Sequence, residues 1–205
     1  MSLAPHAIHL RDGKKIGDKE LIDTMIRDGL WDAFHGYHMG VTAENVAEKF
    51  QVTREEQDRF AFKSQEKALS AQKQGKFKEE IINYIIKSKK SEVNFNKDEH
   101  PREGTSFESL SRLKPVFKNE GTVTAGNASG INGGAAAVIL MNSETADKKG
   151  LEKLVSIKSW ASCGVDPALM GTGPIPSSKK ALDLAGWDIK DVDLFEINEA
   201  FAAQS

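Results

Sequence analysis

The chain has almost none of the cysteine that disulfide-stabilised proteins use. Among its 205 residues there is one cysteine, Cys163, so no intramolecular disulfide can form, which favours a reducing compartment. No run approaches the ~20 apolar residues of a membrane span. The first fifteen residues, MSLAPHAIHLRDGKK, hold too short an apolar stretch for a signal peptide. We therefore expect a soluble, cytoplasmic protein with no membrane partner.

An excess of charge of one sign is also missing. Twenty-eight Lys and Arg against 30 Asp and Glu leave a formal net charge of −2. Bulk charge therefore does not favour nucleic-acid binding, and we expect no nucleic-acid partner. A hydrophobic share of 39% and a charged share of 28% are typical of a globular chain. The length suffices to bury a core without disulfides or metals.

Capping residues and periodicity predict helices in the first half of the chain. Thr42 precedes one helix, and Thr53–Glu56 has the capping-box pattern of a longer helix that Gly75 ends. The same reasoning predicts other elements in this half: helices over 18–27 and 106–113, a strand over 77–87 and a polar loop over 88–105.

The chain changes character at Gly121. Residues 121–134 are rich in glycine and lead into 135–141, which is apolar at every position and typical of a strand covered on both faces of a parallel sheet. The pattern beyond predicts alternating elements: helix 143–149, strand 154–162, helix 177–185 and strand 192–197. This alternation favours an α/β fold with βαβ units.

The end of the chain, NEAFAAQS, predicts the first turns of a helix with no strand after it. A crossover helix without a following strand leaves an apolar face uncovered. We therefore expect the sequence to be a piece of a larger protein.

The glycine-rich stretch is the first candidate binding site. Its glycines let the backbone approach a ligand closely, and Ser129 or Asn127 would hydrogen-bond that ligand. The alternative is a tight turn that feeds a buried strand. The pattern GxxxxGK[ST] is absent, and Gly171-Thr-Gly173 lacks the third glycine of GxGxxG. A P-loop is therefore excluded and a Rossmann cofactor site is disfavoured.

Other reactive side chains give weaker signals. His35 and His38 lie near Asp32 but have no matching ligand pair elsewhere, so we predict no metal site and favour loop packing or ligand contact for His38. No histidine follows Cys163, which favours a small buried residue over a nucleophile.

Polar side chains near predicted strand ends and loops are further candidates. Asn198 directly follows a predicted strand, where open α/β sheets bind ligands, so its amide either orients a water or oxyanion or caps the next helix. Arg102 in the polar loop is a candidate anion ligand, whereas Arg54 and Arg59 are interpreted as part of a solvated helix face.

Several blocks taken together resemble the thiolase family, in family order and over essentially the whole chain. These blocks are Asp23–Met25, Gly36–Gly40, Thr42–Ala47, Arg54–Asp58, Gly121–Gly130, Gly164–Pro167, Met170–Pro176 and Asn198–Phe201. The similarity is greatest to the short-chain, biosynthetic members. It implies an acyltransferase that condenses two acetyl-CoA to acetoacetyl-CoA and CoA, or catalyses the reverse, with coenzyme A thioesters as substrates and no cofactor.

The resemblance also implies an architecture. It predicts thiolase-like βαβ layers with an inserted, mostly helical loop domain, in an incomplete form. Residues 1–118 would be the loop domain, 119–150 the end of the N-terminal half and 151–205 the start of the C-terminal half. The parent protein would be a homotetramer.

The three main catalytic residues of the family have no counterpart here. In the family a cysteine takes the acyl group, a histidine helps to activate it and a second cysteine moves the α-proton. The first lies upstream of the stretch with which this chain begins, and the others lie downstream of the Asn198–Phe201 block. Cys163 matches no catalytic position, so we predict that the chain is inactive on its own.

What the resemblance carries over is mostly coenzyme A binding. Asn198 would hold a water of the first oxyanion hole, Ser129 would hydrogen-bond the pantetheine and Arg102 would lie against the adenine. The remaining residues would line the tunnel and the acyl pocket: Leu30, His38, Met39, Phe117, Ala125, Gly130, Met170, Ala200 and Phe201. Two alternatives stay open: a CoA-binding or assembly fragment without catalysis, and a 3-ketoacyl-CoA thiolase of broader chain length.

Overall fold

A computed structural model describes residues 3–11, 13, 16–89 and 91–205 of the chain. Contacts divide the chain into two compact units, one of residues 1–42 and 131–197 and the other of residues 43–130 and 198–205. Helix α2 (Met39–Phe50) runs across the boundary between the units. The eight C-terminal residues thus belong with a part of the chain from which 67 residues separate them, and the fold joins two motifs that are distant in sequence.

The second unit is built on α3 (Arg54–Lys73), which begins at the predicted capping box. The Thr53 hydroxyl accepts the Glu56 N–H at 3.2 Å, and the Glu56 carboxylate accepts the Thr53 N–H at 2.8 Å. Gly75 follows the C-cap with φ of +70°, a conformation that favours glycine. Both predicted ends of this helix are confirmed. Thr42 instead lies inside α2, where its hydroxyl donates to the Met39 carbonyl at 2.6 Å.

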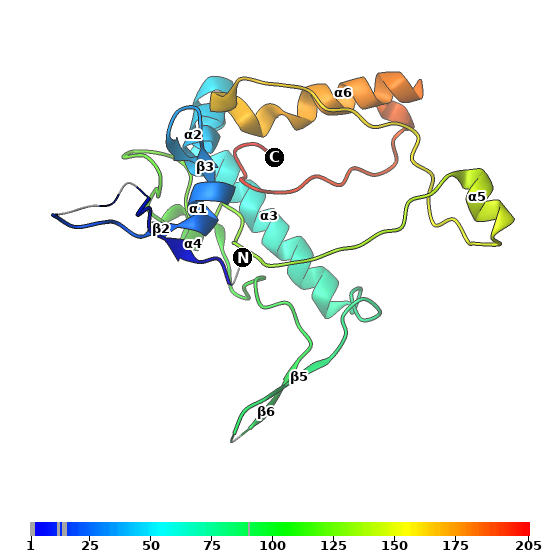
Figure 1. The fold of residues 1–205 in the computed structure, drawn as a ribbon, viewed down its shortest axis with the longest axis horizontal. Coiled ribbons are helices and arrows are strands. Elements are labelled where there is room, and N and C mark those ends of the chain that lie inside the picture. The colour runs from blue at the N-terminus through cyan, green and yellow to red at the C-terminus, as the bar shows by residue number, and fades with distance from the viewer. Residues whose placement is uncertain (1–2, 12, 14–15, 90) are drawn as a thin grey trace. The chain divides into compact units, whose positions relative to one another are not determined.

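Two strands follow α3 where one strand and a loop were predicted. The strand predicted over 77–87 is restricted to β5 (Tyr84–Lys87), which pairs antiparallel with β6 (Glu92–Phe95) in the segment predicted as loop (Figure 1). Ser88 N–H donates to the Ser91 carbonyl at 2.8 Å and closes the turn between them. Part of 88–105 therefore forms a strand despite its polar composition, because it pairs with the neighbouring strand β5. Helix α4 (Phe107–Ser111) forms within the helix predicted over 106–113.

The core of the second unit is small and made mostly of alanine. Its buried residues are Ala43, Ala47, Val123 and Ala203, and Val52, Phe117, Ala128 and Phe201 pack against them. Small side chains on α2 let the backbone of the glycine-rich segment lie close to this helix. The core therefore combines residues of α2, of the glycine-rich segment and of the C-terminal motif.

The first unit begins with short antiparallel pairs. Strand β1 (His6–Ala7) pairs with β2 (Ile22–Asp23), and β3 (Trp31–Asp32) pairs with β4 (Tyr37–His38). Helix α1 (Thr24–Gly29) lies between them. It begins six residues later than the helix predicted over 18–27, because the Asp23 carboxylate accepts the Met25 N–H and sets the N-cap there.

The remainder of the first unit holds helices but not the predicted strands. The helical elements are α5 (Ser143–Lys148), η1 (Pro167–Thr172), α6 (Pro174–Ala185) and η2 (Ile189–Asp191). The segments predicted as strands over 135–141, 154–162 and 192–197 form no strand (Figure 1). Val138, Leu154 and Leu194 are exposed by 81%, 89% and 81%.

The parallel sheet of the predicted βαβ units does not form within the described residues. A β-strand needs a neighbouring backbone to satisfy its N–H and C=O groups. Within the described ranges, the pairing that forms is confined to three two-stranded antiparallel sheets and two isolated bridges. The result is a mixed α/β structure with small sheets. Among the residues described, no helix has both the length and the apolarity of a bilayer span.

Candidate functional site

A buried carboxylate of α2 holds the start of the glycine-rich segment. The Glu44 carboxylate, 4% exposed, accepts the Thr122 N–H at 2.8 Å, the Val123 N–H at 2.9 Å and the Thr122 hydroxyl at 2.9 Å. A Cβ at Gly121 would overlap this carboxylate, so only glycine fits at that position. Glu44 therefore accepts hydrogen bonds from backbone N–H groups that have no partner in a helix or a sheet.

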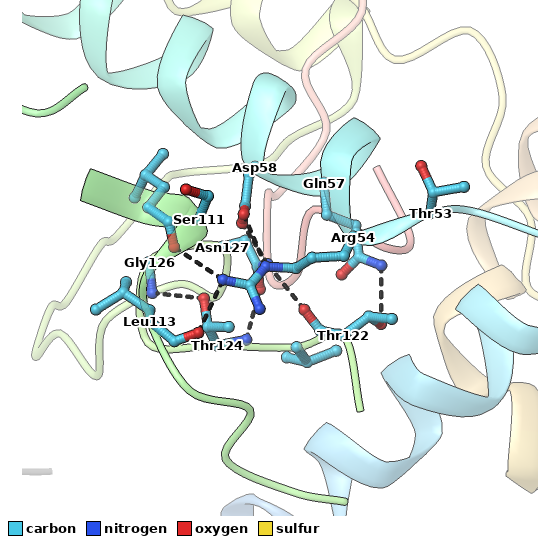
Figure 2. A network of polar contacts seen from close by, with 12 residues as sticks. Thr53, Arg54, Gln57, Asp58, Ser111, Leu113, Thr122, Thr124, Gly126 and Asn127 are labelled. Carbon is cyan, nitrogen blue, oxygen red and sulfur yellow. Dashed lines mark hydrogen bonds and ion pairs between the residues drawn. The ribbon is translucent and has the colours of Figure 1, made fainter. Parts of the chain in front are cut away.

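A second polar cluster holds the middle of the same segment (Figure 2). The Asn127 amide donates to Asp58 Oδ1 at 2.9 Å and to the Thr122 carbonyl at 3.1 Å, and its oxygen accepts the Thr124 N–H at 2.7 Å. Arg54 Nε donates to Asp58 Oδ2 at 2.7 Å. Asn127 and Asp58 are 3% and 1% exposed, so the turn is fixed by hydrogen bonds removed from water.

This cluster corrects two predictions. Asn127 is not a ligand-binding side chain, because its amide is buried and used within the turn. Arg54 is not part of a solvated face, because its guanidinium reaches the Leu110 and Leu113 carbonyls at 2.8 and 2.9 Å as well as Asp58. Arg59 is 59% exposed and pairs with Glu55, as predicted for a solvated position.

The C-terminal motif pairs with the end of the turn that Asn127 fixes. Ser129 N–H donates to the Ala200 carbonyl at 2.9 Å, and Ala202 N–H donates to the Asn127 carbonyl at 2.9 Å. Ala128 and Phe201 form an antiparallel bridge. The helix predicted for 198–205 is limited to a single turn, in which the Phe201 carbonyl accepts N–H groups from Gln204 and Ser205. Pairing with 127–129 therefore replaces the first part of that helix.

The two paired motifs carry candidate polar and aromatic groups. The Ser129 side chain is exposed and donates to the Gly130 carbonyl at 3.1 Å. Phe117 and Phe201 are half-buried and meet edge to face, with ring centroids 6.2 Å apart. An exposed hydroxyl and half-buried aromatic rings on two paired segments are groups that can bind a ligand with amide groups and an apolar chain.

Five further positions complete the candidate set in this unit. The Arg102 guanidinium is exposed, and its backbone N–H donates to Gln65 Oε1 at 3.0 Å. Of the remaining positions, Ala125 and Asn198 are exposed, and Gly130 and Ala200 are half-buried. The imidazole of His100 fills the space that a Cβ at Gly130 would occupy.

Three candidates of the first unit lie around the β3–β4 hairpin. Met39 N–H donates to the Leu30 carbonyl at 2.8 Å, so these two residues close the hairpin. His38, in β4, accepts the Gly40 N–H through Nδ1 at 3.0 Å, which leaves the proton of the neutral ring on Nε2. Burial lowers the pKa of His38 below its ordinary value, so the neutral form predominates at pH 7.

The fourth candidate of the first unit is on a separate element. Met170 lies in η1, where it is 46% exposed, and its carbonyl accepts the Gly173 N–H at 3.0 Å. The structure thus gathers eight of the twelve candidates in the second unit and leaves Leu30, His38, Met39 and Met170 in the first.

The pair of Asp32 and His35 has a local role. His35 Nδ1 lies 2.6 Å from Asp32 Oδ2, and Asp32 Oδ1 accepts the Phe34 N–H at 2.9 Å. Removal from water acts to raise the pKa of Asp32, but the Phe34 N–H and the His35 ring and N–H outweigh it and hold that pKa below its ordinary value. In the part of the chain that the structure describes, no three His, Cys, Asp or Glu gather in a geometry suited to a metal ion.

Comparison with known proteins decides the family. Residues 1–144 match the family model of the thiolase N-terminal domain, and residues 151–205 match that of the thiolase C-terminal domain. The chain belongs to the thiolase family.

Relatives of this thiolase chain match all of it. It is 58% identical over 205 residues to an acetyl-CoA acetyltransferase of Rhizobium meliloti and 53% identical over 207 residues to the cytosolic acetyl-CoA acetyltransferase of Mus musculus, and it covers 52% of each. The crystal structure of the Bacillus anthracis acetyl-CoA acetyltransferase superposes with a TM-score of 0.89 at 46% identity, over 98% of this chain and 51% of that one. Human mitochondrial 3-ketoacyl-CoA thiolase gives a TM-score of 0.90 at 42% identity, over 99% and 52%. The chain therefore spans about half the length of the relatives that it matches.

The residues that fix the site were missed by sequence reasoning. Glu44 is flanked by Ala43, Val46 and Ala47 on one helix, and a carboxylate among small apolar residues was an available signal of a buried acceptor. Arg54 and Asp58 have the i, i+4 spacing of an ion pair. Their partners lie more than fifty positions away, which no local pattern identifies.

We predict that Asn127→Ala destabilises the chain by roughly 2–3 kcal/mol, because Asp58 Oδ1 loses its Asn127 donor and the buried Thr124 N–H loses its acceptor. Urea unfolding of the full chain followed by far-UV circular dichroism measures the effect. Asn119→Ala, at an exposed position, is the matched control and should change stability by less than about 0.5 kcal/mol. Equal stabilities of the two variants would contradict the role of Asn127.

We also predict that His38 titrates below the ordinary histidine value of 6.5. Because the folded-state pKa lies below the unfolded one, the stability that His38 contributes is complete above pH 6.5 and is lost as the pH falls through the folded pKa. NMR titration of the assigned His38 ring protons gives the midpoint. A midpoint at or above 6.5 would be inconsistent with the burial described.

Proposed function

We propose that this chain forms the coenzyme A-binding part of an acetyl-CoA acetyltransferase, which condenses two acetyl-CoA to acetoacetyl-CoA and CoA or catalyses the reverse. The observation that carries the proposal is the pairing of residues 127–129 with 200–202, which brings the segment that carries Ser129 next to the segment that carries Phe201. The acetyltransferase names of the relatives at 53–58% identity support the choice of substrate.

Each end of the ligand has candidate partners in this arrangement. The Ser129 hydroxyl hydrogen-bonds an amide of the pantetheine, whose apolar part lies along Phe117, Ala125 and Gly130. The exposed Arg102 guanidinium lies against the adenine. Ala200 and Phe201 line the acyl end.

In this proposal, the candidates of the first unit have the roles that the family resemblance implies. Leu30, Met39 and Met170 offer apolar contacts to the pantetheine and acyl group. His38, neutral at pH 7, lines the same part of the ligand.

The part of this chain in the chemical step is to stabilise the negative charge that develops on the thioester oxygen. The Asn198 amide holds a water that hydrogen-bonds the thioester oxygen as negative charge develops on it. The acyl-accepting cysteine, the histidine and the proton-moving cysteine come from other parts of a full-length thiolase. The segments 135–141, 154–162 and 192–197, exposed here, become strands when the rest of the sheet pairs with them. We place the full-length protein in the cytoplasm as a homotetramer.

We predict that the chain binds coenzyme A and that the two ends of the ligand can be weakened separately. Ser129→Ala should raise the Kd of both CoA and pantetheine about fivefold, because one hydrogen bond to the shared part is lost. Arg102→Ala should raise the Kd of CoA about fivefold and leave that of pantetheine unchanged. Titration calorimetry on the full chain measures each constant.

Matched substitutions control this experiment. Ser70→Ala and Arg112→Ala change the same residue types at exposed positions outside the candidate site and should leave both constants unchanged. Affinity that does not respond to Ser129→Ala or Arg102→Ala would refute the assigned site.

We predict that the chain shows no thiolase turnover, since it lacks the nucleophile and the base, whose loss removes many orders of magnitude of rate. Incubation with acetyl-CoA followed by intact mass spectrometry tests for an acyl adduct. A stoichiometric adduct on Cys163 together with formation of acetoacetyl-CoA would overturn this prediction. A Cys163→Ala variant assigns any adduct that forms.

A further inference from the structure

Two consecutive residues in the middle of α3 hold two segments that are far apart in the sequence. Ser64 Oγ donates to Glu199 Oε2 at 2.6 Å, and Gln65 Oε1 accepts the Arg102 N–H at 3.0 Å. Neighbouring residues on an α-helix project about 100° apart around its axis, so each can reach a different segment. The two segments carry Asn198 and Arg102, which the proposed function places at the acyl end and the nucleotide end of coenzyme A.

The bond to Glu199 anchors a part of the C-terminal motif that the backbone pairing leaves out. The pairing with 127–129 begins at Ala200, downstream of Asn198. Among the described residues, the partners of the Asn198 carbonyl lie within its own segment: the Ala200 N–H at 3.0 Å and Gln204 Nε2 at 3.3 Å. Glu199 is therefore the side chain that ties the Asn198 end of the segment to a regular element. A hydroxyl–carboxylate bond is charge-assisted and short, which restricts the rotation of that segment.

Helix α3 is well suited to serve as the fixed reference. It has 20 residues, and its first turn is fixed by the capping box at Thr53. The same helix carries Arg54 and Asp58, which hold the glycine-rich turn in place. One rigid element thus contacts the Ser129 turn, the Arg102 loop and the Asn198 segment.

We propose that Ser64 and Gln65 are positioning residues: Ser64 acts through Glu199 to set the place of Asn198, and Gln65 sets the place of Arg102. This inference rests on the proposed function, because Asn198 and Arg102 bind coenzyme A only under that proposal. Neither residue touches the ligand in this proposal. Each acts through the segment that it holds.

The test is NMR and calorimetry on the full chain, with conservative variants as rescue. Ser64→Ala and Glu199→Ala should each raise the amide exchange rate of Ser129 and Ala202 about threefold to tenfold and lower the backbone order parameters of 198–199. Glu199→Gln keeps an acceptor for the Ser64 hydroxyl and should retain near-normal rates. The double variant Ser64→Ala/Glu199→Ala should be no worse than either single variant, because both remove the same bond.

The Gln65 arm has its own readout. Gln65→Ala should raise the Kd of CoA about threefold and leave that of pantetheine unchanged, because it loosens only the Arg102 end. Gln65→Glu keeps the acceptor oxygen and should restore the affinity. Ser70→Ala, on the same helix, is the control that should change neither exchange nor binding.

The outcomes separate this inference from the proposed function. If exchange and order at 198–202 are the same in Ser64→Ala as in Ser70→Ala, Ser64 does not position the segment and its part of the inference is wrong. If Gln65→Ala weakens pantetheine as much as CoA, Gln65 does not act through Arg102. If the unaltered chain binds no CoA while exchange responds to Ser64→Ala as expected, the proposed function fails and the positioning of 198–202 by Ser64 stands.

Discussion

The arrangement depends on how the backbone of residues 121–130 is satisfied without regular secondary structure. Buried N–H groups there are taken by the Glu44 carboxylate and the Asn127 side chain, and Asn127 is in turn held by Asp58. Each of these side chains would be costly to bury alone, and together they satisfy one another. A turn fixed in this way presents the Ser129 N–H to a partner in a single geometry.

The partner that uses this geometry is the C-terminal motif. The backbone of residues 200–202 accepts a hydrogen bond from the turn and donates one to it. The buried network that fixes the turn therefore also places these residues, although none of their side chains belongs to that network. Loss of the network would therefore loosen the candidate site even at residues it does not touch. The contacts of α3 with Glu199 and Arg102 extend the same principle, since a rigid helix holds loops that carry the functional groups.

Sequence reasoning succeeded where the interactions are local. The capping box at Thr53, the stop at Gly75 and the short helices after Ser106 and Asn142 depend on residues within one turn of each other. It failed for the strands over 135–141 and 154–162, because an apolar run predicts burial only if a neighbouring layer covers it. In this chain of about half the relatives' length, those side chains are exposed. Membership of the thiolase family was recognisable because its motifs are contiguous blocks.

By itself, the sequence determined the family and both ends of α3, and it predicted the candidate ligand-binding residues, because all of these are encoded in short stretches. Only the tertiary structure decided that Asn127 and Arg54 serve the interior, that Glu44 supports the glycine-rich turn and that Ser64 and Gln65 hold two distant segments. The physical reason is separation along the chain. A buried acceptor and its donor are chosen by proximity in the fold, and pairs such as Glu44 and Thr122, 78 positions apart, leave no local pattern.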